Sequence, residues 1–189
     1  GPVLLTAAVL DSIPQQTEVL IVGGGHVGQA VAALAADLEF QITVVDDRAE
    51  FVSSARFPRA ANRLSGKIGD LLRQEQVGPD TYCVIVTRGH NHDEEALYHL
   101  VGRGAAYVGM IGSRRKIRLI FDDLAELGVA PETLDQVHAP IGLDIGSQAV
   151  PEIAVSIAAE LVAHRNRALR RHSEYNRAVV SARPSAGDP

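Results

Sequence analysis

A short glycine-rich turn constrains this chain more than any other feature of its sequence. The run GGGHVG at positions 23–28 has the spacing G-x-G-x-x-G. It directly follows the apolar run 18–22 and opens an alanine-rich stretch, 26–38, whose apolar residues recur at helical spacing. The glycines therefore stand between an expected strand and an expected helix, the context in which this spacing is typical of a phosphate-binding turn.

The positions of the turn differ in what they offer a ligand. Gly23 permits the tight turn, Gly25 lets the backbone approach a pyrophosphate, and Gly28 lets the helix pack closely on the strand. His26 opens the helix, whose N-terminus presents N–H groups and a partial positive charge to an anion. Asp46 ends the second expected strand, 21 residues after Gly25, where an acid bonds ribose hydroxyls in NAD-type sites and disfavours a 2′-phosphate. The alternative is a turn whose glycines serve packing alone, followed by a solvated acidic turn.

The rest of the chain alternates expected strands with expected helices. Strands are predicted over 41–45, 82–86 and 105–110, and helices over 93–101, 113–127 and 153–167, with Asp93 as the cap of the first. The segment 49–80 is less regular, with short helices over 50–54 and 71–75. This order predicts one Rossmann-like α/β domain over 18–168, with a parallel sheet and helices on both faces. An N-terminal arm or short helix is expected over 1–17, and a partly disordered tail over 169–189.

Polar segments follow several of the expected strands or precede the last helix. In an open parallel sheet, such loops gather around one crevice at the carboxyl ends of the strands. Beyond the turn and Asp46, the candidate ligand-binding residues in these segments are Thr87, Arg88, His90, Ser113, Arg114, Lys116 and Asp144. Ser113 can cap a helix, and Arg114 and Lys116 stand near its positive end, which would make a second anion site. Asp144 lies between two glycines and could bond a ligand ring or only shape its loop.

Other titratable residues give weaker signals. His90, His92 and Asp93 carry groups that bind metals or move protons, but no fourth ligand stands at a recognisable spacing, so no metal site is predicted. Cys83 lies in an expected buried strand, which favours packing over reactivity. The chain has no G-x-S-x-G, H-E-x-x-H or paired C-x-x-C motif, so no catalytic residue is identified.

Composition narrows the classes of partner. The net charge of −5 and the lack of a basic stripe argue against a nucleic-acid partner. No apolar run reaches the roughly 18 residues that would span a bilayer, so no membrane partner is expected. A single cysteine cannot form an internal disulfide, which fits a reducing cytoplasm. The apolar faces of the first and last helices could pair in a homodimer.

These segments together resemble a known family. The chain is similar to the C-terminal domain of the XdhC/CoxI-type factors, which mature xanthine dehydrogenase and CO dehydrogenase. The resemblance spans roughly residues 14–167 and is specific, because unrelated segments occur in the right order. Besides the glycine turn, the matching segments are VVDDR at 44–48, RFP at 56–58, TRGHNHD at 87–93, IGSRRK at 111–116, GLDIGS at 142–147 and PEIAVSI at 151–157.

The resemblance implies a role in cofactor maturation. Such factors bind molybdenum cofactor, a pterin with a phosphate that is often extended by a nucleotide, assist its sulfuration and pass it to the apo-enzyme. The implied partners are a molybdenum hydroxylase apo-enzyme and a cysteine desulfurase. Family members usually carry a further N-terminal domain, which this chain does not show.

Two alternatives remain open at this point. One is an NAD-dependent oxidoreductase, with NAD(H) as cofactor and His90 or His92 as its acid/base. The other is a regulatory domain that senses NAD or another nucleotide without chemistry. The missing catalytic motifs rank the enzyme below the maturation factor, and only the resemblance separates the maturation factor from the sensor.

Overall fold

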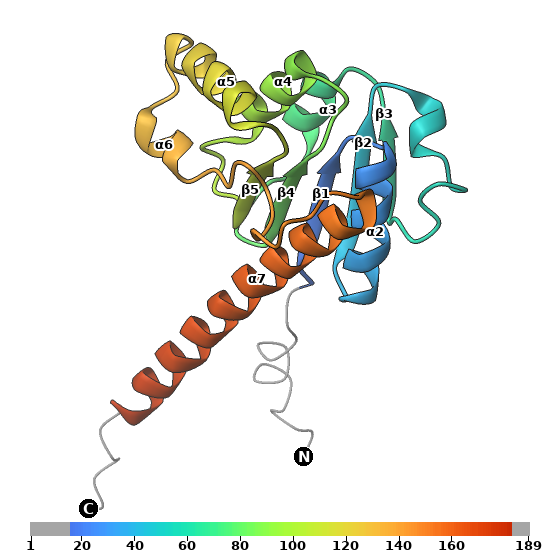
Figure 1. The fold of residues 1–189 in the computed structure, drawn as a ribbon. Coiled ribbons are helices and arrows are strands. Elements are labelled where there is room, and N and C mark those ends of the chain that lie inside the picture. Colours follow the sequence, from blue (N-terminus) through green and yellow to red (C-terminus); the bar gives the residue numbers. More distant parts are fainter. Residues whose placement is uncertain (1–15, 183–189) are drawn as a thin grey trace, which may run out of the picture.

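The sheet of this protein has five parallel strands. A computed structural model describes residues 16–182, so nearly all of the N-terminal arm expected over 1–17 lies outside the described residues. The strands are β1 (Glu18–Val22), β2 (Gln41–Asp46), β3 (Asn62–Ser65), β4 (Thr81–Ile85) and β5 (Tyr107–Met110). Their order is β3-β2-β1-β4-β5 (Figure 1). The chain adds β2 and β3 on one side of β1 and then crosses to add β4 and β5 on the other, so the strand order reverses between the neighbours β1 and β4. Ligands of open parallel sheets bind outside the carboxyl ends of the strands at such a reversal.

Helices cover both faces of the sheet, as the sequence predicts. On one face lie α2 (His26–Asp37) and the long α7 (Val150–Ser181); on the other lie α3 (Ile68–Gln74), α4 (His90–Leu100) and α5 (Arg114–Glu126). Short helices are the 3-10 turn η1 (Ala49–Val52) and α6 (Pro131–Asp135). The described part of the chain forms a single Rossmann-like domain. No helix within residues 16–182 is long and apolar enough to cross a membrane.

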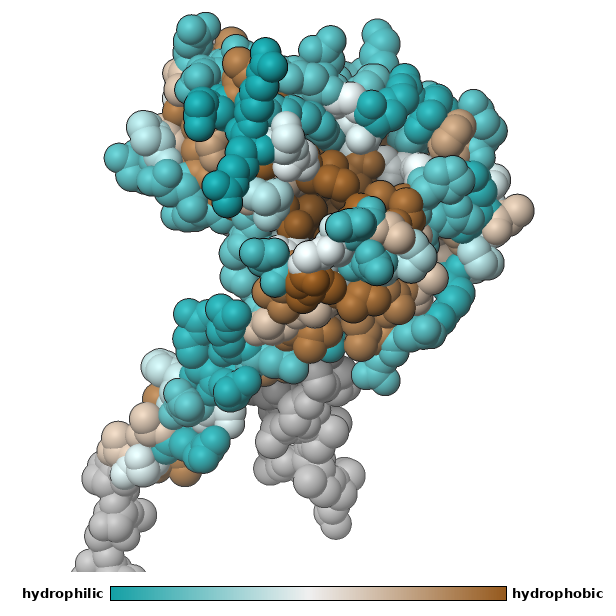
Figure 2. Space-filling model, viewed as in Figure 1, coloured by the Kyte–Doolittle hydropathy of each residue, from teal (hydrophilic) through white to brown (hydrophobic). Residues whose placement is uncertain are grey.

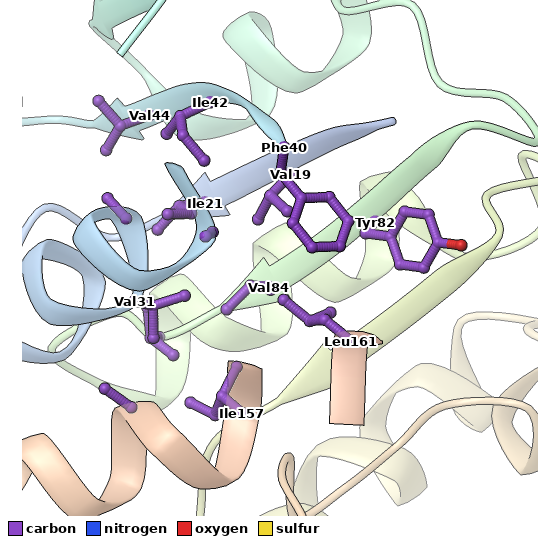
Figure 3. Packing of buried hydrophobic residues seen from close by; sticks show 14 of the residues in the cluster. Val19, Ile21, Val31, Phe40, Ile42, Val44, Tyr82, Val84, Ile157 and Leu161 are labelled. Carbon is purple, nitrogen blue, oxygen red and sulfur yellow. The ribbon is translucent and has the colours of Figure 1, made fainter. Parts of the chain in front are cut away.

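The alternation of side chains along each strand explains the two layers of core. In β1, Val19 and Ile21 pack toward α2 and α7, while Leu20 and Val22 pack toward α3, α4 and α5. All four side chains are fully buried, so a strand of this kind reads as one continuous apolar run. Figure 3 shows the first layer, in which Val31, Ile157 and Leu161 of the two covering helices face the strands.

The irregular segment 49–80 holds an element that the sequence did not reveal. The strand β3 has the sequence NRLS, and only Leu64 is even half-buried. It lies at the edge of the sheet and pairs with β2 alone, so its polar side chains face solvent instead of forming an apolar run. The following helix, α3, begins at Ile68, three residues before the expected start.

The boundaries of two later helices also differ from expectation. We predicted that Asp93 caps a helix over 93–101, but α4 begins at His90, with Gly89 at the cap position. Asp93 lies one turn inside, where it is fully buried. The expected helix over 153–167 extends to Ser181 in α7, because the sequence beyond 167 holds helix-forming residues and no glycine or proline. The expected tail over 169–189 is thus helical as far as Ser181, and 183–189 lie outside the described residues.

Candidate functional site

The glycine turn between β1 and α2 is the centre of the candidate site. A Cβ atom on Gly23, whose φ is 119°, would lie 2.4 Å from the carbonyl oxygen of Val86, and one on Gly28 would lie 2.0 Å from the oxygen of Gly23. Gly25 differs, because a Cβ there meets nothing within 4 Å. Gly23 therefore permits the tight turn and Gly28 the close packing, as predicted, while Gly25 leaves open space at the start of α2.

The open space lies in front of the N-terminus of a helix. Gly25 is the cap residue of α2, and no side chain caps the first turn. The first N–H groups of an α-helix have no acceptor within the helix and carry partial positive charge. His26, the first residue of α2, is exposed beside them. This turn therefore provides what a phosphate needs, namely N–H donors and room for close approach.

Asp46 is used by the protein itself. Its Oδ2 accepts a hydrogen bond from the Gly24 N–H at 2.8 Å, and its Oδ1 accepts from the Arg48 N–H at 2.9 Å and from Arg48 Nε at 3.0 Å. Burial alone would raise the pKa of this carboxyl, but the hydrogen bonds from Arg48 and Gly24 outweigh burial and lower the pKa to about 2. Asp46 thus holds the glycine turn against the end of β2, and a ribose hydroxyl would have to compete with Gly24 and Arg48.

A second arginine supports the same turn from the other side. Arg56 donates to the carbonyl oxygen of Gly24 at 2.8 Å. The guanidinium groups of Arg48 and Arg56 lie 3.4 and 4.8 Å from the ring centroid of Phe51. Cations over an aromatic face are attracted by its quadrupole. Phe51 and the two arginines therefore form a support that sets the position of Gly24.

Two of the predicted residues, Thr87 and Lys116, contact one buried carboxylate, and a third, Ser113, lies beside them. Asp93 accepts hydrogen bonds from the N–H of Thr87 at 3.1 Å and from the Thr87 hydroxyl, and it forms an ion pair with Lys116. Ser113 accepts from the backbone N–H of Lys116 at 3.2 Å, which confirms its role as the cap of α5. The structure therefore brings Thr87, Lys116 and Ser113 together, but two of them satisfy Asp93 and the third caps a helix.

Arg88 bridges the ends of two strands. Its two terminal nitrogens donate to the two carboxylate oxygens of Asp47 at 2.9 and 3.0 Å. His92 lies 3.3 Å from Arg88 and 3.8 Å from Asp47. Asp47 follows β2 and Arg88 follows β4, so this exposed pair flanks β1 and its glycine turn on both sides. Of the predicted cations, Arg88 is thus placed beside the turn.

The remaining candidates are not drawn into one cluster. His90 lies 3.1 Å from Glu94 of its own helix and 3.7 Å from Asp123 of α5. Arg114 is exposed in the first turn of α5, and Asp144 is exposed in the loop before α7. Among residues 16–182, Arg114 and Asp144 form no side-chain hydrogen bond or ion pair with another candidate residue. The prediction that these segments line one crevice therefore stays a prediction.

The residues that hold the site include several that sequence reasoning missed. Arg48 and Arg56 stood in the segments that carry the resemblance, yet they were not named as site residues. The role of Asp93 depends on Lys116, 23 positions away in another helix, so no local spacing indicates it. The contact between His90 and Glu94 could have been predicted, because a histidine and an acid four residues apart share one face of a helix.

A cavity lies at the other end of the sheet. Its volume is about 430 Å³, and it is lined by the segment 100–108 before and within β5, by 133–138, and by His164 of α7. The residues before β5 lie at the amino edge of the sheet, opposite the glycine turn. The cavity and the turn are therefore separate features of the molecule.

The fold and the turn together define a Rossmann-type domain with a glycine-rich strand-to-helix turn at the reversal of its sheet. Residues 19–161 match the XdhC Rossmann domain, and the chain belongs to this family. This confirms the resemblance that the sequence segments indicated.

Individual relatives agree with this assignment. An uncharacterized protein of Escherichia coli, YqeB, is 37% identical over 150 residues, and a probable subunit of the xanthine dehydrogenase of Bacillus subtilis is 28% identical over 162 residues. These alignments cover 79% and 86% of this chain, but only 27% and 47% of the two relatives. A solved structure of a xanthine dehydrogenase from Bacillus halodurans has a TM-score of 0.71 at 25% identity, over 92% of this chain and 45% of that one. The chain therefore spans less than half the length of these relatives.

Proposed function

We propose that this domain binds molybdenum cofactor, in its pterin or nucleotide form, and helps to insert it into a molybdenum hydroxylase such as xanthine dehydrogenase. Membership of the XdhC Rossmann family and the names of two relatives support xanthine dehydrogenase as the client, the enzyme that receives the cofactor. The observation that supports binding of this ligand is the open space at Gly25, in front of the uncapped N-terminus of α2. The domain then acts as a carrier, and the molybdenum centre catalyses its reaction only in the client enzyme.

The residues present fit the phosphate of such a ligand. The N–H groups of the first turn of α2 would hold the phosphate, since an anion there needs no side-chain cation. Arg88 follows β4, the strand next to β1, and its present partner Asp47 is an exposed residue that a ligand phosphate could replace. His26 is exposed in the same first turn and adds a side-chain donor beside the N–H groups.

NAD is a weaker candidate for the same turn. An NAD-type site uses a free carboxylate at the end of the second strand to bond ribose hydroxyls. In this protein that carboxylate is Asp46, and both of its oxygens already accept hydrogen bonds from Gly24 and Arg48. We therefore rank an oxidoreductase or an NAD sensor below the maturation factor.

The single cysteine does not support sulfur transfer by this domain. Cys83 is fully buried within β4, and burial raises the pKa of its thiol to about 12. The thiolate is the nucleophile in sulfur exchange, and this thiol would remain protonated at neutral pH. In our proposal, sulfuration is therefore carried out by a cysteine desulfurase that acts as a partner.

The proposal is tested by ligand binding to the wild type and to two glycine variants. Gly25→Ala places a methyl group in the open space of the turn without a clash in the protein, so cofactor affinity should fall, with at most a small loss of stability because alanine is a poorer helix cap than glycine. Gly78→Ala is the matched control, since its Cβ also meets nothing within 4 Å but lies in the turn before β4. Thermal unfolding with excess molybdenum cofactor, its cytosine nucleotide form, NAD and NADH gives the readout.

The outcomes separate the alternatives. A ligand that binds only the folded state raises the free energy of unfolding by about 2.7 kcal/mol at a hundredfold excess over its Kd. Stabilisation by molybdenum cofactor that is lost in Gly25→Ala and kept in Gly78→Ala supports the proposal. Stabilisation by NAD or NADH alone contradicts it. Delivery is then measured as the activity gained by apo xanthine dehydrogenase on addition of the loaded domain.

A further inference from the structure

Three metal-binding side chains converge on the outer surface of α4 and α5. His90 and Glu94 lie one turn apart on α4, and Asp123 comes from α5. One donor atom from each, the imidazole Nε2 and two carboxylate oxygens, lies within 4.8 Å of the other two. From the residues alone we expected no metal, because His90, His92 and Asp93 have no fourth ligand at a recognisable spacing; Asp123 lies 33 positions after His90.

The spacing of the donor atoms suits a small divalent cation. Two ligands bound to zinc at about 2.1 Å in tetrahedral geometry lie roughly 3.4 Å apart. His90 Nε2 lies 3.1 Å from Glu94 Oε2 and 3.7 Å from Asp123 Oδ2, values on either side of that separation. A cation could therefore be bound with small rotations of the three side chains, of which Asp123 is exposed and the other two are half-buried.

The electrostatics of the cluster favour a cation as well. Glu94 and Asp123 each place a carboxylate oxygen within 4.8 Å of the other. Two carboxylates at close range repel one another unless a proton or a cation lies between them. A single half-buried imidazole carries at most one positive charge, so it compensates the two carboxylates only in part.

The geometry points to a surface site for a divalent transition-metal cation, held by His90, Glu94 and Asp123 with its remaining positions open to water or a ligand. One imidazole with two carboxylates prefers Zn²⁺ or Mn²⁺ to Mg²⁺, because magnesium favours an all-oxygen shell. This inference does not depend on the proposed function, since the site is formed by helices α4 and α5 and not by the glycine turn.

Direct binding of Zn²⁺ to the tag-free, EDTA-treated chain tests the site. We expect one Zn²⁺ per chain by calorimetry and equilibrium dialysis, with Mg²⁺ bound far more weakly. Asp123→Asn, Glu94→Gln and His90→Ala should each weaken binding by about tenfold or more, since even outer-shell changes cost that much. The matched control is Asp122→Asn, which removes the same charge from the neighbouring exposed position of α5.

A second readout reports the ligands themselves. Co²⁺ bound by an imidazole and two carboxylates gives a visible absorption spectrum that depends on coordination, and this spectrum should change in His90→Ala but not in His92→Ala. Equal Zn²⁺ affinity in Asp122→Asn and Asp123→Asn, or the lack of stoichiometric binding to the wild type, would overturn the inference and leave the cluster as a surface ion pair. Both measurements are made without molybdenum cofactor, so failure here says nothing about the glycine turn.

Discussion

Asp46 shows how a single carboxylate can set the shape of a binding turn. Position alone predicted an acid that reaches a ligand, because Asp46 ends the strand where such acids stand. The structure instead places its oxygens on Gly24 and Arg48. The identity of the residue was readable from the sequence, but its role was not, because that role depends on Arg48 folding back two positions onto the same carboxylate.

Replacing Asp46 by Asn should destabilise the protein in a pH-dependent way. The folded-state pKa of about 2 lies below the ordinary value of 3.8, so the charged carboxylate stabilises the fold above about pH 4. We expect Asp46→Asn to lower the free energy of unfolding by about 2 kcal/mol at pH 7. The difference from the wild type should shrink as the pH falls from 4 toward 2.

Urea unfolding of both proteins across this pH range measures the effect. Asp47→Asn serves as the control, because it removes the neighbouring exposed carboxylate and should cost less than about 1 kcal/mol. A cost for Asp46→Asn that stays constant down to pH 2 would contradict a role for the charged form.

Lys116 compensates a charge that has no access to water. Asp93 is fully buried, while Lys116 is a quarter exposed. Lys116→Met should destabilise the fold by roughly 3 kcal/mol, because it leaves a buried carboxylate with only the Thr87 donors. Adding Asp93→Leu in the same chain should recover part of the loss, because the double variant buries no unpaired charge. A double-mutant cycle by urea unfolding measures this coupling, and additive costs would show that the pair does not act as a unit.

At the scale of the elements, the strands with apolar sequences were predicted, including the edge strand β5, whereas the polar edge strand β3 was not. The strands β1, β2 and β4 lie inside the sheet with helices on both faces, so their sequences are continuous apolar runs. The edge strand β3 is four residues long, and its polar side chains face solvent. Its sequence therefore does not distinguish it from a loop. The glycine spacing located the turn for a similar reason, since sterics at Gly23 and Gly28 exclude any other residue.

The helix α7 combines a packed half with a projecting half. Its first turns lie against α2 and the sheet, and the rest of the helix extends away from the domain (Figure 1). Figure 2 shows hydrophobic residues on the face formed by α2 and the start of α7, and mainly hydrophilic ones along the projecting part. Apolar residues no longer recur at helical spacing after Leu161, so the sequence predicted that this helix ends earlier than it does.

Two leucines of α7 should therefore respond differently to the same substitution. Leu161 is fully buried, whereas Leu169 is 55% exposed. Leu161→Ala should cost about 2–5 kcal/mol through the loss of buried methylene groups and the cavity left behind. Leu169→Ala, with the same change in helix propensity, should alter the free energy of unfolding by less than about 0.5 kcal/mol. Urea unfolding at neutral pH gives both values, and a large cost at Leu169 would mean that a partner covers it in solution.

For the whole molecule, the boundary of the folding unit can be tested by shortening the chain. Arg165 donates to the carbonyl oxygen of Leu38 at 2.7 Å and lies over the ring of Phe40, and it is the last residue of α7 with such a contact to the body within residues 16–182. Removing 169–189 should therefore leave the melting temperature within about 2 °C of the full chain, since exposed residues contribute little to stability. Removing 161–189 instead takes away Leu161 and Arg165, and this chain should melt well below the full one.

The same experiment reports on self-association. A homodimer held by the projecting half of α7 would make the melting temperature of the full chain rise with protein concentration, because association stabilises the folded state by mass action. Shortening at 168 would then lower the melting temperature and remove the concentration dependence. Equal melting of the full chain and the chain shortened at 168 across a hundredfold range of concentration would show that residues 169–189 lie outside the folding unit. The projecting helix would then be free for a partner other than a second copy.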